Sequence, residues 1–272
     1  MSNNHNSDSN YLHGHHESVL RSHRRRSAEN SAAYLLPRLA PDAKVLDVGC
    51  GPGTITVGLA AHVANGSVVG LDAAPEILEE ARALSEAAGQ RNLRFEIGDV
   101  YELAFNDGSF DVVHAHQVLQ HLKDPLRALG EMRRVCRPGG IVAVRDADFG
   151  AMCWTPATEG LKEWRTLYQT VARNIGGEPD AGRHLYTWAR QAGFSRVEAS
   201  ASAWCFSTPD ERAWWGGLWA ERLTQSRFAE QATSAGLATP SDLERLAEVW
   251  RRWVNEEDAC FFILHGEVLC SP

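Results

Sequence analysis

Long apolar runs are missing from this 272-residue sequence, in which no stretch reaches the roughly 18 apolar residues of a membrane span. The first ten residues, MSNNHNSDSN, lack the apolar core of a secretory signal. The six cysteines include no C-x-x-C pair, which argues against a disulfide framework and against a zinc site. We therefore expect a cytoplasmic protein with reduced thiols and without a membrane partner.

Positive charge is in deficit, because 27 Lys and Arg residues face 35 Asp and Glu residues and the formal charge is −8. This balance argues against nucleic acid or an anionic membrane as the main partner. One dense basic cluster, RSHRRR at residues 21–26, is interpreted as a solvated helix face. The three histidines within residues 13–16 have no further ligand cluster beside them, so we predict no metal site.

Apolar segments of strand length alternate with helical segments between residues 44 and 145. The strands are predicted at 45–48, 68–71, 94–97, 111–115 and 141–145, and the helices at 54–63, 76–88 and 125–135. A further helical stretch is predicted over about 17–39. Strands separated by helices of this length indicate a doubly wound, mostly parallel α/β sheet. Such a sheet binds its ligand beyond the carboxyl ends of its strands.

The nine residues VLDVGCGPG, Val45 to Gly53, combine a strand, an acid and three glycines. The apolar residues of this strand do not alternate with polar ones, so both of its faces should be buried. Gly49 and Gly51 then remove side chains where the chain turns, which lets a ligand approach the backbone. A tight turn alone would also need glycine, and the segments that follow decide between the two interpretations.

Two further acids end the next two strands. Asp72, in VVGLDAAPEIL, stands 23 residues after Gly49, where a carboxylate can accept both hydroxyls of a ribose, with Ala73 beside it. Asp99, in FEIGDVYEL, can accept a hydrogen bond from an adenine amino group while Val100 offers apolar contact to the ring. Together these residues predict a nucleoside site.

The glycine loop indicates what is attached to the nucleoside. A dinucleotide favours G-x-G-x-x-G, with its pyrophosphate on a helix N-terminus. This loop is G-x-G-x-G, with Thr54 in the place of the third glycine. The preceding Asp47 would repel a pyrophosphate but suits an ammonium group. An adenosine with an amino-acid tail fits better than NAD, and we predict S-adenosylmethionine (SAM) as the ligand.

Four segments occur in order over roughly residues 43–148: VLDVGCGPG, VVGLDAAPEIL, IGDVYELAFNDGSFDVVHAHQVLQHLKDP and EMRRVCRPGGIVAVRD. With these segments the chain resembles the class I SAM-dependent methyltransferases, in the ubiquinone/menaquinone-biosynthesis-like (type 11) branch. The resemblance implies a Rossmann-like, seven-stranded sheet with its last strand inserted antiparallel, and S-adenosyl-L-homocysteine as the product. It also implies that Gly49 and Gly51 approach the methionine part, while His116 and Gln117 line the sulfonium side. Gln120 departs from the pattern, since relatives often carry a second histidine there.

Residues 149–272 are predicted to complete the sheet, interrupted by two helical insertions at about 158–175 and 209–254. A helix at 181–194 precedes strands at 197–206 and 259–269. The insertions hold the aromatic residues Trp164, Tyr168, Trp214, Trp215, Trp219, Trp250 and Trp253. Aromatic residues at helical spacing more often pack a core than line a ligand site. Because these insertions sit where this fold places its substrate cover, we expect a largely apolar, aromatic-walled pocket.

Residues 1–42 form a tail and helices ahead of the SAM-binding core at 43–148. We expect this first segment to fold over the bound cofactor as a lid, with Tyr11 against the methionine end. A helix that merely packs on the sheet edge is the alternative.

Methyl transfer depends on alignment of the acceptor with the sulfonium carbon, and an oxygen acceptor also needs a base. His121 follows the fourth strand and Asp146 ends the fifth, so both can face the cleft. We predict His121 as the base and Asp146 as the group that orients a histidine or a substrate hydroxyl. Structural hydrogen bonding is the alternative for both residues.

The predicted function is transfer of a methyl group from SAM to an oxygen or carbon of a small, largely apolar metabolite. Two alternatives stay open. The protein could keep SAM as a structural ligand while it binds or cyclises a metabolite. A nucleic-acid methyltransferase is the other alternative, which the acidic composition disfavours.

Overall fold

The computed structural model of this protein describes residues 17–272. Tyr11, which we predicted to contact the methionine end of the cofactor, lies outside the described residues, as do the three early histidines. None of the helices in residues 17–272 is long and apolar enough to cross a membrane.

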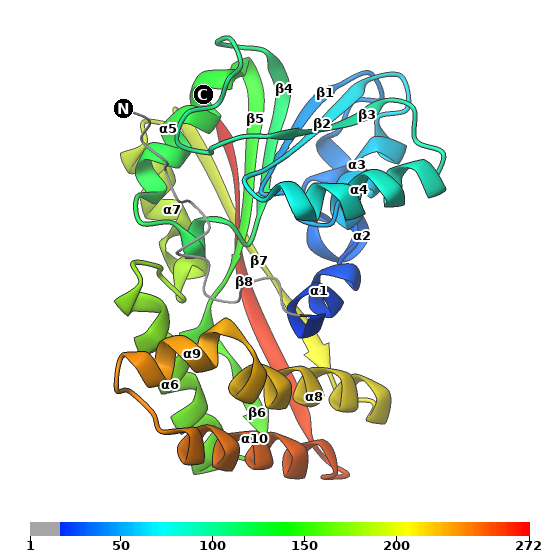
Figure 1. Cartoon of the computed structure of the whole chain (residues 1–272). Coiled ribbons are helices and arrows are strands. Elements are labelled where there is room, and N and C mark those ends of the chain that lie inside the picture. Colours follow the sequence, from blue (N-terminus) through cyan, green and yellow to red (C-terminus); the bar gives the residue numbers. More distant parts are fainter. Residues whose placement is uncertain (1–16) are drawn as a thin grey trace, which may run out of the picture.

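An eight-stranded sheet forms the centre of the molecule (Figure 1). Its strands are β1 Lys44–Val48, β2 Ser67–Asp72, β3 Leu93–Ile97, β4 Phe110–His116, β5 Cys136–Ala147, β6 Cys153–Thr155, β7 Arg196–Phe206 and β8 Cys260–Ser271. The order is β3-β2-β1-β4-β5-β8-β6, with β7 also paired to β8. The first five strands pair in parallel, and β8 runs antiparallel to β5 and β7. The doubly wound, mostly parallel sheet is therefore confirmed.

One strand exceeds the predicted seven. β6 has three residues and pairs with the first residues of β8, from Cys260 to Phe262. A segment this short carries no periodic signal, which explains why the sequence pattern did not reveal it.

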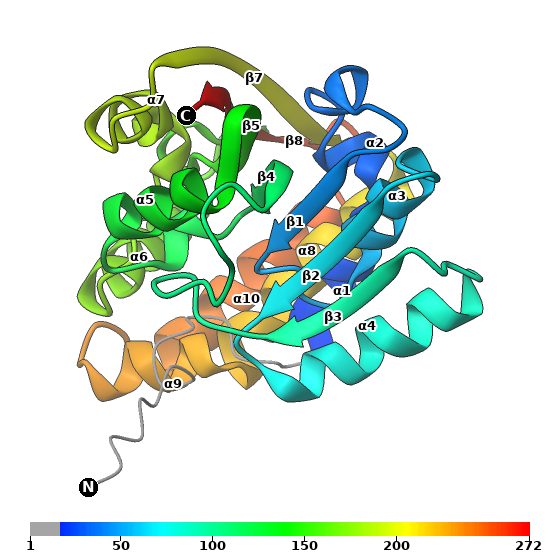
Figure 2. The same ribbon diagram turned by 90° about the horizontal axis from the view of Figure 1, so that it is seen from above.

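Ten α-helices accompany the sheet in residues 17–272. They are α1 Glu17–Arg24, α2 Ala28–Ser31, α3 Thr54–His62, α4 Pro75–Ala87, α5 Pro125–Val135, α6 Glu159–Asn174, α7 Ala181–Gln191, α8 Pro209–Gln225, α9 Arg227–Ser234 and α10 Pro240–Val254. Seen from above, α3 and α4 lie on one side of the sheet and α5 and α7 on the other (Figure 2). Separate apolar cores fill the two sides, one between α3 and the sheet and one beneath α5 and α7.

Two predicted helical stretches are broken by capping residues. The stretch at 17–39 divides at Ser27, whose side chain accepts a hydrogen bond from the Asn30 backbone in a capping box. The stretch at 209–254 divides into α8, α9 and α10, because Ser226 and Thr239 cap the second and third of these helices. Each break lets the chain change direction and fold back on the sheet.

A third apolar core lies away from the parallel strands. The helices α6, α8, α9 and α10 gather around the far end of the long strands β7 and β8, at the bottom of Figure 1. Their core includes the fully buried rings of Trp164, Trp219 and Trp250. We call these four helices the cover.

Candidate functional site

The glycine loop turns tightly between β1 and α3. Gly49 has a φ of 66° and Gly53 a φ of 80°, a left-handed conformation that favours glycine. A Cβ at Gly49 would meet the Val118 side chain at 2.5 Å, so this position also needs the missing side chain for space. The Gly49 and Cys50 amides donate to the Leu71 carbonyl, at 2.7 and 3.1 Å, which ties the loop to β2.

Asp72 stands at the end of β2, beside that loop. Its carboxylate accepts hydrogen bonds from the backbone amides of Gly51, at 2.9 Å, and Ala74, at 3.1 Å. The side chain is half-buried. These two bonds hold the carboxylate beside the glycine loop, and a carboxylate in that position can accept hydrogen bonds from ligand hydroxyls.

Asp47 lies beneath the loop and is almost fully buried. One of its oxygens accepts from the Thr56 hydroxyl at 2.6 Å, and the other lies 2.7 Å from Nδ1 of His114. These two groups fix the carboxylate in the wall of the cavity described next. Direct contact with a ligand ammonium group stays a prediction.

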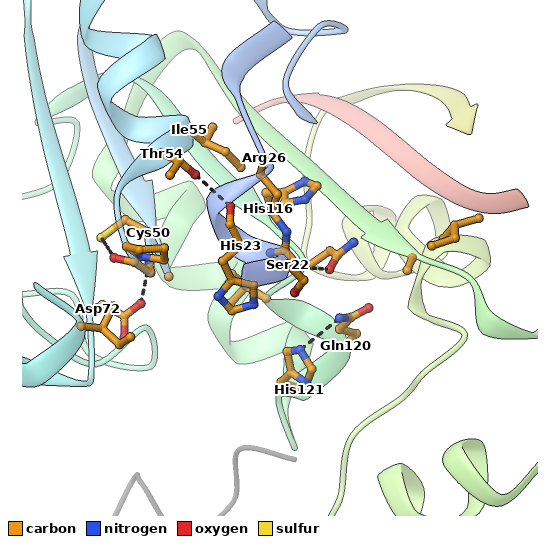
Figure 3. A pocket seen from close by; sticks show the side chains of 18 of the residues that line it. Ser22, His23, Arg26, Cys50, Thr54, Ile55, Asp72, His116, Gln120 and His121 are labelled. Carbon is orange, nitrogen blue, oxygen red and sulfur yellow. Dashed lines mark hydrogen bonds between the residues drawn. The ribbon is translucent and has the colours of Figure 1, made fainter. Parts of the chain in front are cut away.

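A cavity of about 240 Å³ lies between the carboxyl ends of the strands, α1 and the cover. Its wall includes most of the predicted cofactor residues, namely Asp47, Gly49, Gly51, Asp72, Ala73, His116 and Gln117. In Figure 3, Asp72 and Cys50 lie on one side of this space and Gln120 and His121 on the other. Asp99 and Val100 follow β3, but neither lines the cavity. Asp99 is exposed and accepts from the Tyr101 amide at 2.8 Å.

His116 and Gln117 come directly at the end of β4. Gln117 has a φ of 54°, which is uncommon for a residue with a side chain and is typical of functional turns. Its side chain bridges two elements, since the amide oxygen accepts from Arg26 at 2.7 Å and the amide nitrogen lies 2.9 Å from Nε2 of His265. Burial, reinforced by Arg26 and Arg145, holds the pKa of His116 well below its usual range, so this imidazole is neutral.

Of the two predicted catalytic residues, His121 lines the cavity and Asp146 does not. Burial, together with the charge of Arg26, lowers the pKa of His121 to about 3. Its Nε2 lies 3.0 Å from the side-chain nitrogen of Gln120. Asp146 is fully buried behind this segment, accepts from the Gln120 amide at 3.2 Å, and has its pKa raised to about 7 by burial. Its geometry therefore suits a positioning residue.

The segment from α1 to α2 crosses the mouth of the cavity, and Ser22, His23 and Arg26 form part of the wall. The His23 carbonyl accepts from the Thr54 hydroxyl at 3.1 Å. On the opposite side, the Ser22 hydroxyl accepts from Arg222 of α8 at 2.7 Å. The segment thus contacts the glycine-loop helix and the cover at once, and Figure 3 shows His23 and Ser22 between Asp72 on one side and Gln120 on the other.

The basic cluster at 21–26 is partly solvent-exposed, as expected for a helix face, but it also forms ion pairs with other elements. Its arginines reach across to other elements: Arg21 to Glu221, Arg24 to Glu80 at 2.7 Å, and Arg25 to Glu211 at 3.5 Å. Arg25 also lies over the ring of Trp214, 4.6 Å from its centroid. The partners belong to α4 and α8, so their proximity is a property of the fold.

The wall opposite the glycine loop is mostly aromatic. It consists of Phe149, Met152, Trp204, Trp214, Trp215, Trp219 and Ile263, with the buried cation Arg222. Sequence reasoning found the tryptophans of α8 but missed Phe149, Met152, Trp204 and Arg222. Trp164, Trp250 and Trp253 line no part of this cavity and pack the core of the cover instead.

Comparison with known proteins gives consistent results. A family model described as "Methyltransferase domain" matches residues 39–193. An uncharacterized methyltransferase of Schizosaccharomyces pombe is 37% identical over 95% of both chains. A probable methyltransferase of Aspergillus luteorubrus is 30% identical over 96% of both. The YcgJ protein of Bacillus subtilis has a similar fold, with a TM-score of 0.59 and 17% identity over 89% of this chain and 98% of that one. An N-methyltransferase of Haemonchus contortus, solved with S-adenosylhomocysteine, has a TM-score of 0.53 and 19% identity, over 88% of this chain and 52% of that one.

Proposed function

This chain belongs to the class I SAM-dependent methyltransferases, and we propose that it methylates an oxygen or carbon of a small, largely apolar metabolite. The observation that carries this proposal is the two-sided cavity. Bare backbone and the acids Asp47 and Asp72 lie on one side, and the aromatic wall, to which α8 of the cover contributes three tryptophans, lies on the other. A cationic donor suits the acidic side, whereas a flat, apolar acceptor suits the aromatic side.

On the donor side, SAM is the cofactor, and each predicted contact is a proposal. Asp72, which the Gly51 and Ala74 amides hold at the end of β2, accepts the ribose hydroxyls. The methionine part follows the bare backbone of Gly49 and Gly51, towards His116 and Gln117. Asp99 and Val100 flank the adenine from the end of β3, outside the enclosed part of the cavity.

On the acceptor side, we attribute the rate chiefly to alignment within a closed, water-poor space. His121 contacts the acceptor as a neutral imidazole, because burial and Arg26 hold its pKa near 3. Asp146 positions the segment that carries His121 through its bond to the Gln120 amide. A proton released from an oxygen acceptor leaves to water, whereas a carbon or already ionised acceptor requires no strong base at His121.

The segment at 17–31 forms the described part of the lid. It contacts α3 through Thr54, β4 through Gln117 and the cover through Arg222. Closure over the bound donor would exclude water from the sulfonium carbon. The six free cysteines suit an enzyme of a reducing cytoplasm.

The deciding experiment incubates the full chain with methyl-labelled SAM and an extract of small metabolites. We expect label in an organic-soluble product and release of S-adenosylhomocysteine. Binding of SAM with no labelled product in any extract would instead favour a structural role for the cofactor. Label in RNA or DNA, with none in small molecules, would contradict the proposed acceptor class.

A further inference from the structure

Two cysteines meet on the face of the sheet that points away from the cavity. Cys205 of β7 and Cys260 of β8 place their sulfur atoms 3.4 Å apart. The register pairs Cys205 with Phe262, two residues from Cys260, and residues two apart on a strand share one face. Cys205 is exposed, Cys260 is half-buried, and both are free thiols. The sulfurs would need to approach by little more than 1 Å to reach the roughly 2.05 Å of a disulfide.

The two thiols flank the α8–α10 part of the cover. Cys205 comes just before Thr208, the N-cap of α8, and Cys260 follows the end of α10 at Val254. The chain between them is therefore the whole of α8, α9 and α10, which leaves the sheet at β7 and returns at β8 (Figure 1). A bond between the two sulfurs would close this segment into a loop.

The neighbours of Cys205 connect this position to the cavity. Trp204 lines the cavity. Phe206 stacks on Trp215 of the aromatic wall, with ring centroids 4.8 Å apart. Both side chains lie on the face opposite to the Cys205 sulfur, because neighbouring residues on a strand point to opposite faces. A cross-link at Cys205 thus constrains the backbone that carries the aromatic wall without entering the cavity.

We propose that Cys205 and Cys260 form a reversible disulfide that fixes both ends of the α8–α10 segment of the cover. The co-reactant is a small disulfide such as oxidised glutathione. The Cys205 thiolate attacks one of its sulfurs, the S–S bond breaks, and one glutathione thiolate leaves. The Cys260 thiolate then attacks the Cys205 sulfur and expels the second glutathione. The protein loses two electrons and two protons, and the oxidised glutathione becomes two reduced molecules.

The order of these two steps follows from exposure. Cys205 is the more accessible thiol, so we expect it to receive the glutathione first. Burial, with the hydrogen bond and proximity of Cys205, raises the pKa of Cys260 to about 11. Once Cys205 carries the glutathione its contribution is gone, but burial still favours the thiol form of Cys260, so we expect the closing step to accelerate as the pH rises and the thiolate fraction grows.

The test oxidises the full chain with glutathione disulfide at mildly alkaline pH, blocks the remaining thiols with N-ethylmaleimide, and maps the peptides by mass spectrometry. We expect one linked pair, Cys205 with Cys260, and a mass loss of two hydrogens. Cys153 of β6 is the matched control, because it is also exposed and lies across β8 from Cys205, opposite Phe262. Cys153→Ser should form the bond as the wild type does, whereas Cys205→Ser should not.

Proteolysis measures the consequence for the cover. We expect cleavage within α8–α10 to be several-fold slower in the oxidised wild type, and dithiothreitol to restore the original rate. A stable glutathione adduct on Cys205 without a link, or a link from Cys260 to Cys153, would overturn the assignment of the pair. A correct link with equal cleavage rates would overturn the effect on the cover.

Discussion

The Thr54 hydroxyl, at the start of the helix that follows the glycine loop, donates a hydrogen bond to the His23 carbonyl at 3.1 Å. This bond joins the N-terminal segment to α3. A Cβ placed on Gly51 would lie 3.8 Å from Nδ1 of His23, so the segment lies directly over the loop. Anything bound against the loop is therefore covered by residues 22–26.

The first prediction concerns the N-terminal segment that lies over the glycine loop. S-adenosylhomocysteine should protect Arg21–Arg26 from trypsin, because the product fills the space that this segment encloses. We expect cleavage there to slow at least several-fold when the product is present at saturation. Mass spectrometry of the early fragments measures the rate, and cleavage after Arg91, which is exposed in the loop before β3, serves as the internal reference.

A pair of variants separates a lid from simple packing. Thr54→Ala removes the donor to His23, whereas Thr54→Ser keeps a hydroxyl at the same position. The alanine variant should be cut faster at residues 21–26 than the serine variant. Equal cutting with and without product in the wild type would mean that the segment does not close over the cofactor.

The second prediction concerns the ribose contact. Asp72→Ala should weaken SAM binding by about tenfold or more, because charge-assisted hydrogen bonds contribute roughly 1.5–3 kcal/mol each and 1.4 kcal/mol is a factor of ten. Titration calorimetry measures the dissociation constant. Asp107→Ala is the control for a carboxylate on an exposed loop, and it should bind as the wild type does. An unchanged constant in Asp72→Ala would place the ribose elsewhere.

The donor side was predictable from the sequence because its signals are local. VLDVGCGPG contains the buried strand, the turn and the helix start within nine residues, and Asp72 ends the next strand. A parallel sheet brings such strand ends to one edge, so their proximity needs no further information. Pattern reasoning could therefore place Asp47, Gly49, Gly51 and Asp72 on one wall.

The acceptor side could not be predicted in the same way. Arg26 and Arg222 lie 196 positions apart, and both line the cavity because α1 packs against α8, where Ser22 accepts a hydrogen bond from Arg222. Phe149 and Met152 follow β5 in a short irregular segment without periodicity. The ion pairs of the basic cluster at 21–26 could not be predicted either, because its acidic partners, such as Glu80 and Glu221, come from other helices.

The third prediction concerns the aromatic wall. Trp214→Ala should lower kcat/KM for the acceptor by about tenfold or more while SAM affinity stays near that of the wild type, because this half-buried ring lines only the acceptor side. Trp215→Phe should also lower kcat/KM for the acceptor without weakening SAM binding. Trp215→Ala is less suitable, since truncating a buried tryptophan costs about 3–5 kcal/mol of stability. Trp250→Phe, within the cover core, is the control and should leave the acceptor constants unchanged.

The opposite pattern would also be informative. A Trp214 variant that folds normally but loses SAM binding together with acceptor turnover would place α8 on the cofactor. Circular dichroism establishes that the variant is folded before either constant is compared.

The fourth prediction concerns the stability of the fold against pH. Burial raises the pKa of Asp146 from 3.8 to about 7. The stabilisation linked to its proton is thus fully present below about pH 4 and is lost as the pH rises towards 7. A shift of about three units corresponds to an upper bound of roughly 4 kcal/mol. Asp146→Asn should remove this loss, because the amide never ionises and still accepts from the Gln120 amide.

The measurement is the difference in melting temperature between variant and wild type at mildly acidic and mildly alkaline pH. We expect the difference to shift by several degrees in favour of the variant as the pH rises. Comparing differences is necessary because the lowered pKa values of His116 and His265 act in the opposite sense, with stability lost as the pH falls below about 6.5. Asp258→Asn, at an exposed position, should show no such trend, and a flat trend in Asp146→Asn would contradict an elevated pKa.

The last prediction concerns the chemistry at His121. General-base catalysis contributes about 10²- to 10⁴-fold when the base has a pKa near the working pH. The pKa of His121 is about 3, so its imidazole is a weak base and stays neutral across the physiological range. We therefore expect His121→Ala to lower kcat by about tenfold or less, through lost contact with the acceptor, and we expect no ionisation of His121 in the pH profile of the wild type. His121→Gln, which keeps a hydrogen-bonding side chain, should recover part of the rate. A loss of a hundredfold or more, with an acidic limb near pH 6.5 that disappears in the variant, would mean that the bound ligands raise the pKa of this histidine and that it removes a proton from an oxygen acceptor. A loss of about tenfold or less in kcat would instead point to a carbon or an already ionised oxygen as the atom that receives the methyl group.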